Sequence, residues 1–141
     1  DNAPFASPFE LRYAWHVFHR LDVDAMNRAA AALLGRHDFH SFETDWPNRL
    51  SSVRTIYDLQ VQRLDDIVHV EVEADGFLYN MVRAIVGTLS LVGTGKRPEA
   101  WVAEVLKAEN RVEAGPTAPA RGLFMLRVNY DRTPEGRATA T

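Results

Sequence analysis

Two stretches of this 141-residue chain hold side chains suited to chemistry on a carboxylate, a phosphate or a nucleobase. The first is the apolar run 77–89, in which Arg83 is the one charged residue. At helical spacing its apolar residues form a core stripe, and Arg83 falls at the edge of that stripe beside Tyr79. A guanidinium there can reach a cleft, and its planar fork suits carboxylates and phosphates. By itself, the pattern favours the simpler interpretation, in which the arginine stem only covers apolar surface.

The second stretch is 115–123, which reads Gly-Pro-Thr-Ala-Pro-Ala-Arg-Gly-Leu. Its two prolines and two glycines fix an irregular backbone at low entropic cost, which suits the delivery of Arg121 or Leu123 to a site. Composition alone favours this interpretation no more than a rigid connector before a final strand.

Three further groups of polar residues give weaker hypotheses. His37 and His40 would share one face of a helical turn and could ligate a metal, but no third ligand is evident, and exposed or capping histidines are the simpler interpretation. Arg49 and Arg54 flank two serines in a loop that could hold phosphates or simply be solvated. The acidic residues of segment 71–75 are expected on an exposed sheet face.

Composition limits the classes of function. The chain has 16 Lys plus Arg against 19 Asp plus Glu, a net charge of −3 and no cysteine. The missing cysteines exclude disulfide frameworks, thiolate nucleophiles and Cys-based metal sites. No apolar run approaches the ~20 residues of a membrane span, so we expect a soluble, cytoplasmic protein. An RNA partner would require a local basic patch, because the net charge gives no global signal.

The length corresponds to one domain. The chain starts at Asp1 rather than at a methionine, so we expect it to be a piece of a longer protein. Among short motifs, the sequence has no P-loop, dinucleotide fingerprint, zinc-protease HExxH or GxSxG nucleophile elbow.

Hydrophobic periodicity predicts the elements that must position these residues. We expect a strand over 9–18, then a helix between an Asp22 cap and a Gly35 stop, with a possible further turn over 37–42. A β-hairpin over 53–74 follows, and then helices over 78–92 and 98–108. The rest is expected to be an irregular segment over 109–122, a strand over 123–130 and a frayed tail over 131–141. This order predicts an α+β fold in which helices cover one face of an antiparallel sheet.

Four segments together resemble the TruA family of tRNA pseudouridine synthases. They are Gly35 to Phe42, Ser52 to Ile56, Phe77 to Lys96 and Thr117 to Leu123, and they occur in the order typical of the family. The resemblance implies half of a pseudouridine synthase fold, with residues 1–130 as the C-terminal lobe. It also implies an RNA isomerase that converts uridines of the tRNA anticodon stem-loop into pseudouridine without a metal or an organic cofactor.

The resemblance also implies roles for particular residues. Arg83 matches the arginine that pairs with the catalytic aspartate, and Leu123 matches the apolar floor beneath the flipped base. Arg121 occupies a variable position and is not expected to be catalytic. We expect Arg49, Arg54 and Lys96 to contact RNA, mainly through phosphates.

The aspartate itself belongs to an Arg-Thr-Asp-Ala-Gly-Val-His motif, which this chain lacks. We therefore expect the chain to be inactive alone, and to form a homodimer through this lobe in the parent enzyme. The alternatives are a stand-alone RNA-binding module and a dimerisation module.

Overall fold

The computed structural model describes residues 9–16, 20–44 and 51–128, without the side chains of 124–128. Its elements follow in the order β1 (Phe9–His16), α1 (Val23–Ala30), the 3-10 turn η1 (Ala31–Leu33), β2 (Gly35–Asp38), η2 (His40–Phe42), β3 (Val53–Leu64), β4 (Ile67–Ala74), α2 (Met81–Gly93), α3 (Ala100–Ala108), η3 (Arg111–Glu113), η4 (Ala120–Gly122) and β5 (Leu123–Val128). The remaining ends of the expected strands 9–18 and 123–130, and the expected tail, lie outside the described residues.

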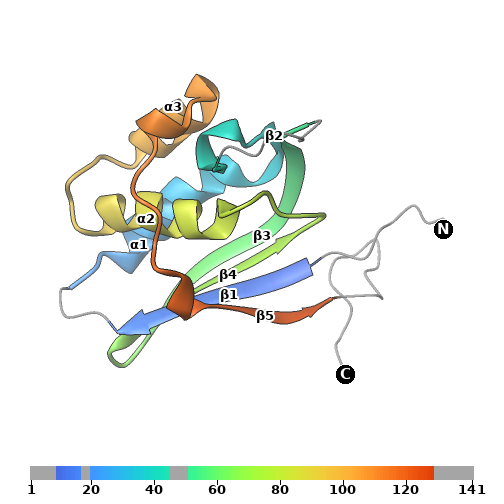
Figure 1. Ribbon diagram of the computed structural model, residues 1–141. Coiled ribbons are helices and arrows are strands. Elements are labelled where there is room, and N and C mark those ends of the chain that lie inside the picture. The colour runs from blue at the N-terminus through green and yellow to red at the C-terminus, as the bar shows by residue number, and fades with distance from the viewer. Residues whose placement is uncertain (1–8, 17–19, 45–50, 129–141) are drawn as a thin grey trace.

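The strands form one five-stranded sheet in the order β2-β3-β4-β1-β5. Every neighbouring pair is antiparallel. The three helices lie over one face of this sheet (Figure 1). This arrangement confirms the predicted α+β class.

The hairpin of β3 and β4 supplies much of the core, because its inward residues alternate along each strand. Val68, Val70, Val72 and Ala74 of β4 are at most 1% exposed. The expectation that the acidic face of β4 is exposed is wrong for Glu73, which is only 2% exposed. β4 lies inside the sheet, and Glu73 is therefore flanked by its register partners Glu10 of β1 and Asp58 of β3.

Helix α1 begins as predicted, since the Asp22 side chain accepts a hydrogen bond from the Ala25 N–H at 3.0 Å. Gly35 follows with a φ of +94°, a left-handed conformation that favours glycine. The expected further turn is confirmed only over His40–Phe42. Gly35–Asp38 instead form the edge strand β2, because their backbone pairs with 53–56 of β3.

Helix α2 begins at Met81, three residues later than expected. Asn80 has a φ of +62° and turns the chain into the helix. The predicted core stripe is confirmed, since each of its members is at most 3% exposed: Leu78, Val82, Ile85, Val86 and Leu89. No helix within the described ranges is long and apolar enough to span a membrane.

Residues 109–122 form a strap that runs from α3 across α2 to the start of β5 (Figure 1). Apart from η3 and η4 it is irregular, as predicted. The strap presses closely on α2: a Cβ added to Gly87 would lie 1.6 Å from the Pro116 carbonyl oxygen, and one added to Gly115 would lie 2.9 Å from the Thr88 Cα. Only glycine permits this approach.

Candidate functional site

Arg83 lies in the first turn of α2 and is half-buried against the strap. Its Nε donates a hydrogen bond to the Ala118 carbonyl at 2.7 Å. Its Nη1 donates to the Asn80 side-chain oxygen at 2.9 Å. Two of the three guanidinium nitrogens are therefore fixed, one by Asn80 at the N-terminus of α2 and one by Ala118 of the strap.

The third nitrogen of the guanidinium, Nη2, has no hydrogen-bond partner among the described residues. An arginine fixed through Nε and one Nη can still present an Nη to an incoming group. The best match for such a donor is a carboxylate or a phosphate, because the hydrogen bond is then charge-assisted. Arg83 is thus a pre-oriented cationic donor rather than a side chain that only covers apolar surface.

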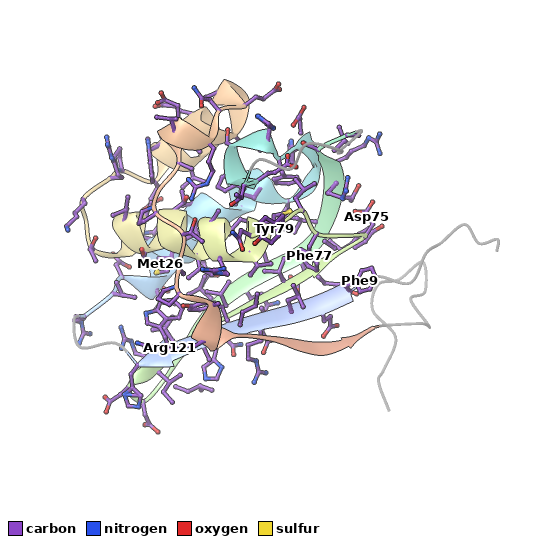
Figure 2. The ribbon with its side chains drawn as sticks, viewed as in Figure 1. Phe9, Met26, Asp75, Phe77, Tyr79 and Arg121 are labelled. Carbon is purple, nitrogen blue, oxygen red and sulfur yellow. The ribbon has the colours of Figure 1, made fainter. Side chains whose placement is uncertain are left out.

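Asn80 ties this arginine to the segment after η2. Its side-chain nitrogen donates to the Thr44 hydroxyl at 3.0 Å, and the Thr44 N–H donates to the Tyr79 carbonyl at 3.1 Å. The left-handed backbone of Asn80 lets one amide face both Thr44 and Arg83. Tyr79 beside it is 51% exposed, at the N-terminal end of α2 (Figure 2).

The strap is fastened to α2 by polar contacts of its own. The Gly115 N–H donates to the buried Thr88 hydroxyl at 3.0 Å, and the Ala118 N–H donates to the Arg83 carbonyl at 3.0 Å. Arg111 donates to the Gly115 carbonyl at 2.8 Å and to the Thr117 hydroxyl at 2.7 Å. Burial lowers the pKa of Arg111, but an arginine remains charged at neutral pH.

Tyr13 of β1 holds the strap from the sheet side. Its ring is 2% exposed, and its hydroxyl donates to the Pro119 carbonyl at 2.7 Å. Burial raises the pKa of Tyr13 above its usual value, and the positive charges of Arg83 and Arg121 oppose that shift. The phenol is therefore neutral and lies within the electrostatic reach of both arginines.

Leu123 is the first residue of β5 and packs partly buried against the core. Its backbone is in register with Tyr13. Arg83 and Leu123, which are 40 positions apart in the sequence, are therefore connected by a few strap residues that both α2 and β1 hold. The strap thus links the two residues, whose roles in a site remain predictions.

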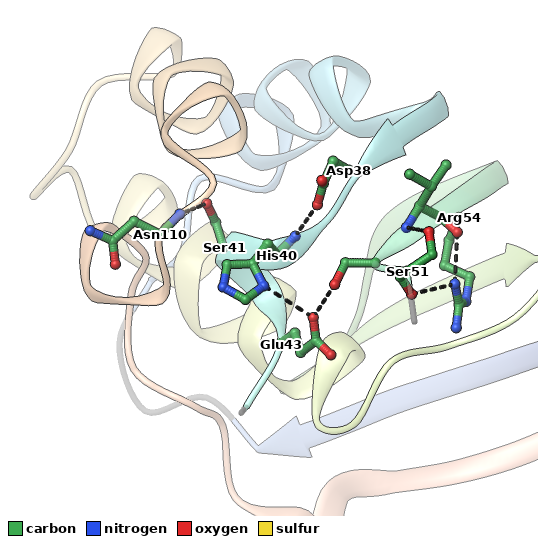
Figure 3. Close-up of polar contacts among 9 residues, drawn as sticks. Asp38, His40, Ser41, Glu43, Ser51, Arg54 and Asn110 are labelled. Atoms are coloured by element: carbon green, nitrogen blue, oxygen red, sulfur yellow. Dashed lines mark hydrogen bonds and ion pairs between the residues drawn. The ribbon is translucent and has the colours of Figure 1, made fainter. Parts of the chain in front are cut away.

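The predicted RNA-contact residues are placed separately. Arg54 lies at the start of β3, and its Nη1 donates to the Val53 carbonyl at 2.7 Å and to the Ser51 carbonyl at 3.2 Å (Figure 3). Lys96 is exposed beyond the C-terminal end of α2, about 15 Å of helix from the turn that carries Arg83. Arg49 lies outside the described residues.

The two histidines are in different elements, so they do not share a helix face. His37 lies in β2 with its Nε2 2.7 Å from the Leu34 carbonyl oxygen. His40 lies in η2 with its Nδ1 3.3 Å from Glu43 Oε1 (Figure 3). In the part of the chain that the structure describes, no group of three or more His, Asp or Glu side chains is arranged to hold a metal ion.

A hollow of about 540 Å³ opens beside the strap. Its lining residues are Tyr13, Ala14, Trp15, His16, Ile67, Pro119, Arg121 and Gly122. Figure 2 shows Arg121 near the C-terminal end of β1. Neither Arg83 nor Leu123 lines the hollow, so it is not the place where those two residues act together.

Comparisons with known proteins identify the family of this chain. A family model described as tRNA pseudouridine synthase matches residues 29–131, which include Arg83, the strap and Leu123. The chain belongs to the tRNA pseudouridine synthase family. Three relatives, each called tRNA pseudouridine synthase A, are similar over nearly the whole chain.

The relative from Brevibacillus brevis is 52% identical over 130 residues, which are 92% of this chain and 53% of the relative. The relative from Myxococcus xanthus is 47% identical over 138 residues, 97% of this chain and 52% of the relative. The relative from a Thermoanaerobacter species is 44% identical over 129 residues, which are 92% of this chain and 53% of the relative. The chain thus spans about half the length of these tRNA pseudouridine synthases.

Sequence patterns predicted Arg83 and Leu123 but did not point to the residues that hold them. Tyr13 lies within the expected strand 9–18, where an aromatic residue is normal and signals no polar role. Asn80 was included in the helix, although asparagine tolerates the left-handed conformation that starts it. The available signal was the type of residue 80, an asparagine three positions before Arg83.

Proposed function

We propose that this chain forms the half of a tRNA pseudouridine synthase that orients the catalytic carboxylate and supports the target base. The carboxylate, an aspartate, would come from the other half of the enzyme. The observation that carries this proposal is the geometry of Arg83, which is fixed through Nε and Nη1 and retains Nη2 for a further acceptor.

Arg83 would act on the aspartate in two ways. The charge-assisted hydrogen bond fixes the orientation of the carboxylate. The nearby positive charge also favours its ionised form, by lowering its pKa. The ionised aspartate assists departure of the uracil from the ribose C1′, and the base then rotates and rejoins through C5. In the balance of the reaction, the N1–C1′ bond breaks and the C5–C1′ bond forms. The hydrogen on C5 leaves as a proton and N1 takes up a proton from solvent, so the product is an isomer of uridine.

Leu123 would provide an apolar surface beneath the uracil. A base that is turned out of its stack loses contacts on both faces, and a dry side chain restores some of them. Leu123 suits this role because it is partly buried against the core, so its position is fixed by packing.

The substrate would be a tRNA, with the uridines of its anticodon stem-loop as targets. Arg54, Lys96 and Arg49 would contact phosphates around the site rather than the reacting base. The family resemblance further supports action in the cytoplasm and as a homodimer, with this lobe in the dimer contact.

The direct test uses the full-length protein that carries this chain and an unmodified tRNA transcript labelled with tritium at uridine C5. Turnover releases tritium to water and leaves pseudouridine, which nucleoside chromatography separates from uridine. We expect both signals, and an Arg-Thr-Asp motif in the gene upstream of Asp1. Tight tRNA binding without tritium release would overturn the proposal and favour an RNA-binding module.

A further inference from the structure

We propose that Tyr13 is a positioning residue of the active site, which orients Arg83 by holding the strap segment that binds the guanidinium. This inference rests on the proposed function. It concerns a residue at which the sequence shows no chemical motif, and it starts from the contacts of two consecutive strap carbonyls.

The carbonyls of Ala118 and Pro119 bind different elements. The Ala118 oxygen accepts from Arg83 Nε of α2 at 2.7 Å, and the Pro119 oxygen accepts from the Tyr13 hydroxyl of β1 at 2.7 Å. A shift of the peptide between them would lengthen both hydrogen bonds. The acceptor that orients the guanidinium is thus fixed in part by the phenol.

Two further contacts join Tyr13 to the same segment. A Cβ added to Gly122 would lie 2.7 Å from the Tyr13 Cζ, so the ring and the strap backbone are in close contact. The backbone of Tyr13 is also in register with Leu123. Tyr13 therefore contacts the strap at Pro119 and Gly122 and pairs with Leu123, the first residue of β5.

The chemistry of Tyr13 suits a fixed donor. Tyr13 is 2% exposed, so its hydroxyl is largely shielded from water. A buried hydroxyl that loses its partner is costly, which makes this hydrogen bond persistent. Tyr13 is not expected to touch the substrate, because its hydroxyl is already engaged with the backbone.

The test compares Tyr13→Phe with wild type in the full-length enzyme. Phenylalanine keeps the ring and removes only the hydroxyl, so we expect kcat to fall about five- to tenfold, the factor that one neutral hydrogen bond supports. The KM for tRNA should stay within about twofold, because a positioning contact does not bind RNA. Tyr57→Phe, at a 39% exposed tyrosine of β3, is the matched control and should retain the wild-type kcat.

A double-mutant cycle with Arg83→Lys separates positioning from general stability. If Tyr13 acts through Arg83, Tyr13→Phe should change kcat by less than about twofold in the Arg83→Lys background. All variants are assayed below their measured unfolding temperatures. If Tyr13→Phe does not fold, Gly122→Ala is the second variant: its added Cβ would lie 2.7 Å from the Tyr13 Cζ and 2.8 Å from the Ala14 carbonyl oxygen, so it separates the strap from β1 and should also lower kcat. An unchanged kcat, or additive losses in the cycle, would overturn the inference, whereas an inactive wild-type enzyme would refute the proposed function instead.

Discussion

Arg83 and Ala118, 35 positions apart in the chain, exchange two hydrogen bonds. The Arg83 Nε donates to the Ala118 carbonyl at 2.7 Å, and the Ala118 N–H donates to the Arg83 carbonyl at 3.0 Å. This reciprocal pair joins the first turn of α2 to the strap through both main chain and side chain. The orientation of the guanidinium therefore depends on how well the strap is packed.

Leu123→Ala should impair catalysis without abolishing it. The substitution removes apolar surface beneath the base, worth roughly 1–2 kcal/mol, so kcat/KM should fall about tenfold. Leu64→Ala, at a 56% exposed leucine next to the hairpin turn, is the matched control and should behave as wild type. Steady-state tritium release measures the activity of both variants. Equal activity of the two would show that Leu123 does not line the base pocket.

Gly87→Ala should displace the strap. The new Cβ would lie 1.6 Å from the Pro116 carbonyl oxygen, which the backbone cannot accommodate without moving. We expect a loss of roughly 3 kcal/mol in the free energy of unfolding, together with a loss of kcat. Gly95→Ala is the control: nothing lies within 4 Å of its added Cβ, so only its positive φ costs stability, about 1 kcal/mol, and activity should remain. Denaturant titration and kinetics that showed equal effects would argue against tight packing on Gly87.

Asn80→Ala should loosen Arg83 without removing it. The guanidinium would keep the Ala118 carbonyl and lose the Asn80 oxygen, so kcat should fall about tenfold. Asn27→Ala is a matched control, because the Asn27 side chain binds the main chain of Val61, on β3. Its variant should lose stability but keep the wild-type kcat in the folded enzyme. The reverse result, with kcat lost only in Asn27→Ala, would contradict the anchoring role of Asn80.

The stability of the enzyme should depend on Tyr13 in alkaline solution. Burial raises the pKa of Tyr13, while an unfolded tyrosine titrates near pH 10. Its contribution is therefore fully present below about pH 10 and is lost as the pH rises towards the raised pKa, because the unfolded chain then releases the proton first. Denaturant titrations across this range should show a shallower fall in the free energy of unfolding for Tyr13→Phe than for wild type. Identical slopes would show that the phenol is not shielded.

The sequence predicted most elements because their patterns are local. The alternation of Val68, Val70 and Val72 and the Asp22 cap specify a strand and a helix start by short-range chemistry. The burial of Glu73 and the strand over Gly35–Asp38 depend on which strands lie beside them, which no local pattern records. Long-range pairing therefore accounts for these two errors.

The same distinction applies to the site. Arg83 is conspicuous as a lone charge in an apolar run, and Leu123 follows a segment rich in proline and glycine. Tyr13 contributes through its contact with Pro119, which is 106 positions away in the chain. Asn80 contributes through its contact with Thr44, which is 36 positions away. Their roles become apparent only when α2, the strap and β1 are seen together.

We propose that Arg83 orients a catalytic carboxylate and does not bind RNA. The most direct measurement determines kcat at saturating tRNA and the tRNA dissociation constant for Arg83→Ala in the full-length enzyme. Arg28→Ala, at an exposed arginine paired with Glu99, serves as the matched control. We predict that Arg83→Ala lowers kcat by at least about 100-fold while the dissociation constant changes less than about threefold. Near-normal kcat, or weakened tRNA binding with kcat intact, would contradict the claim.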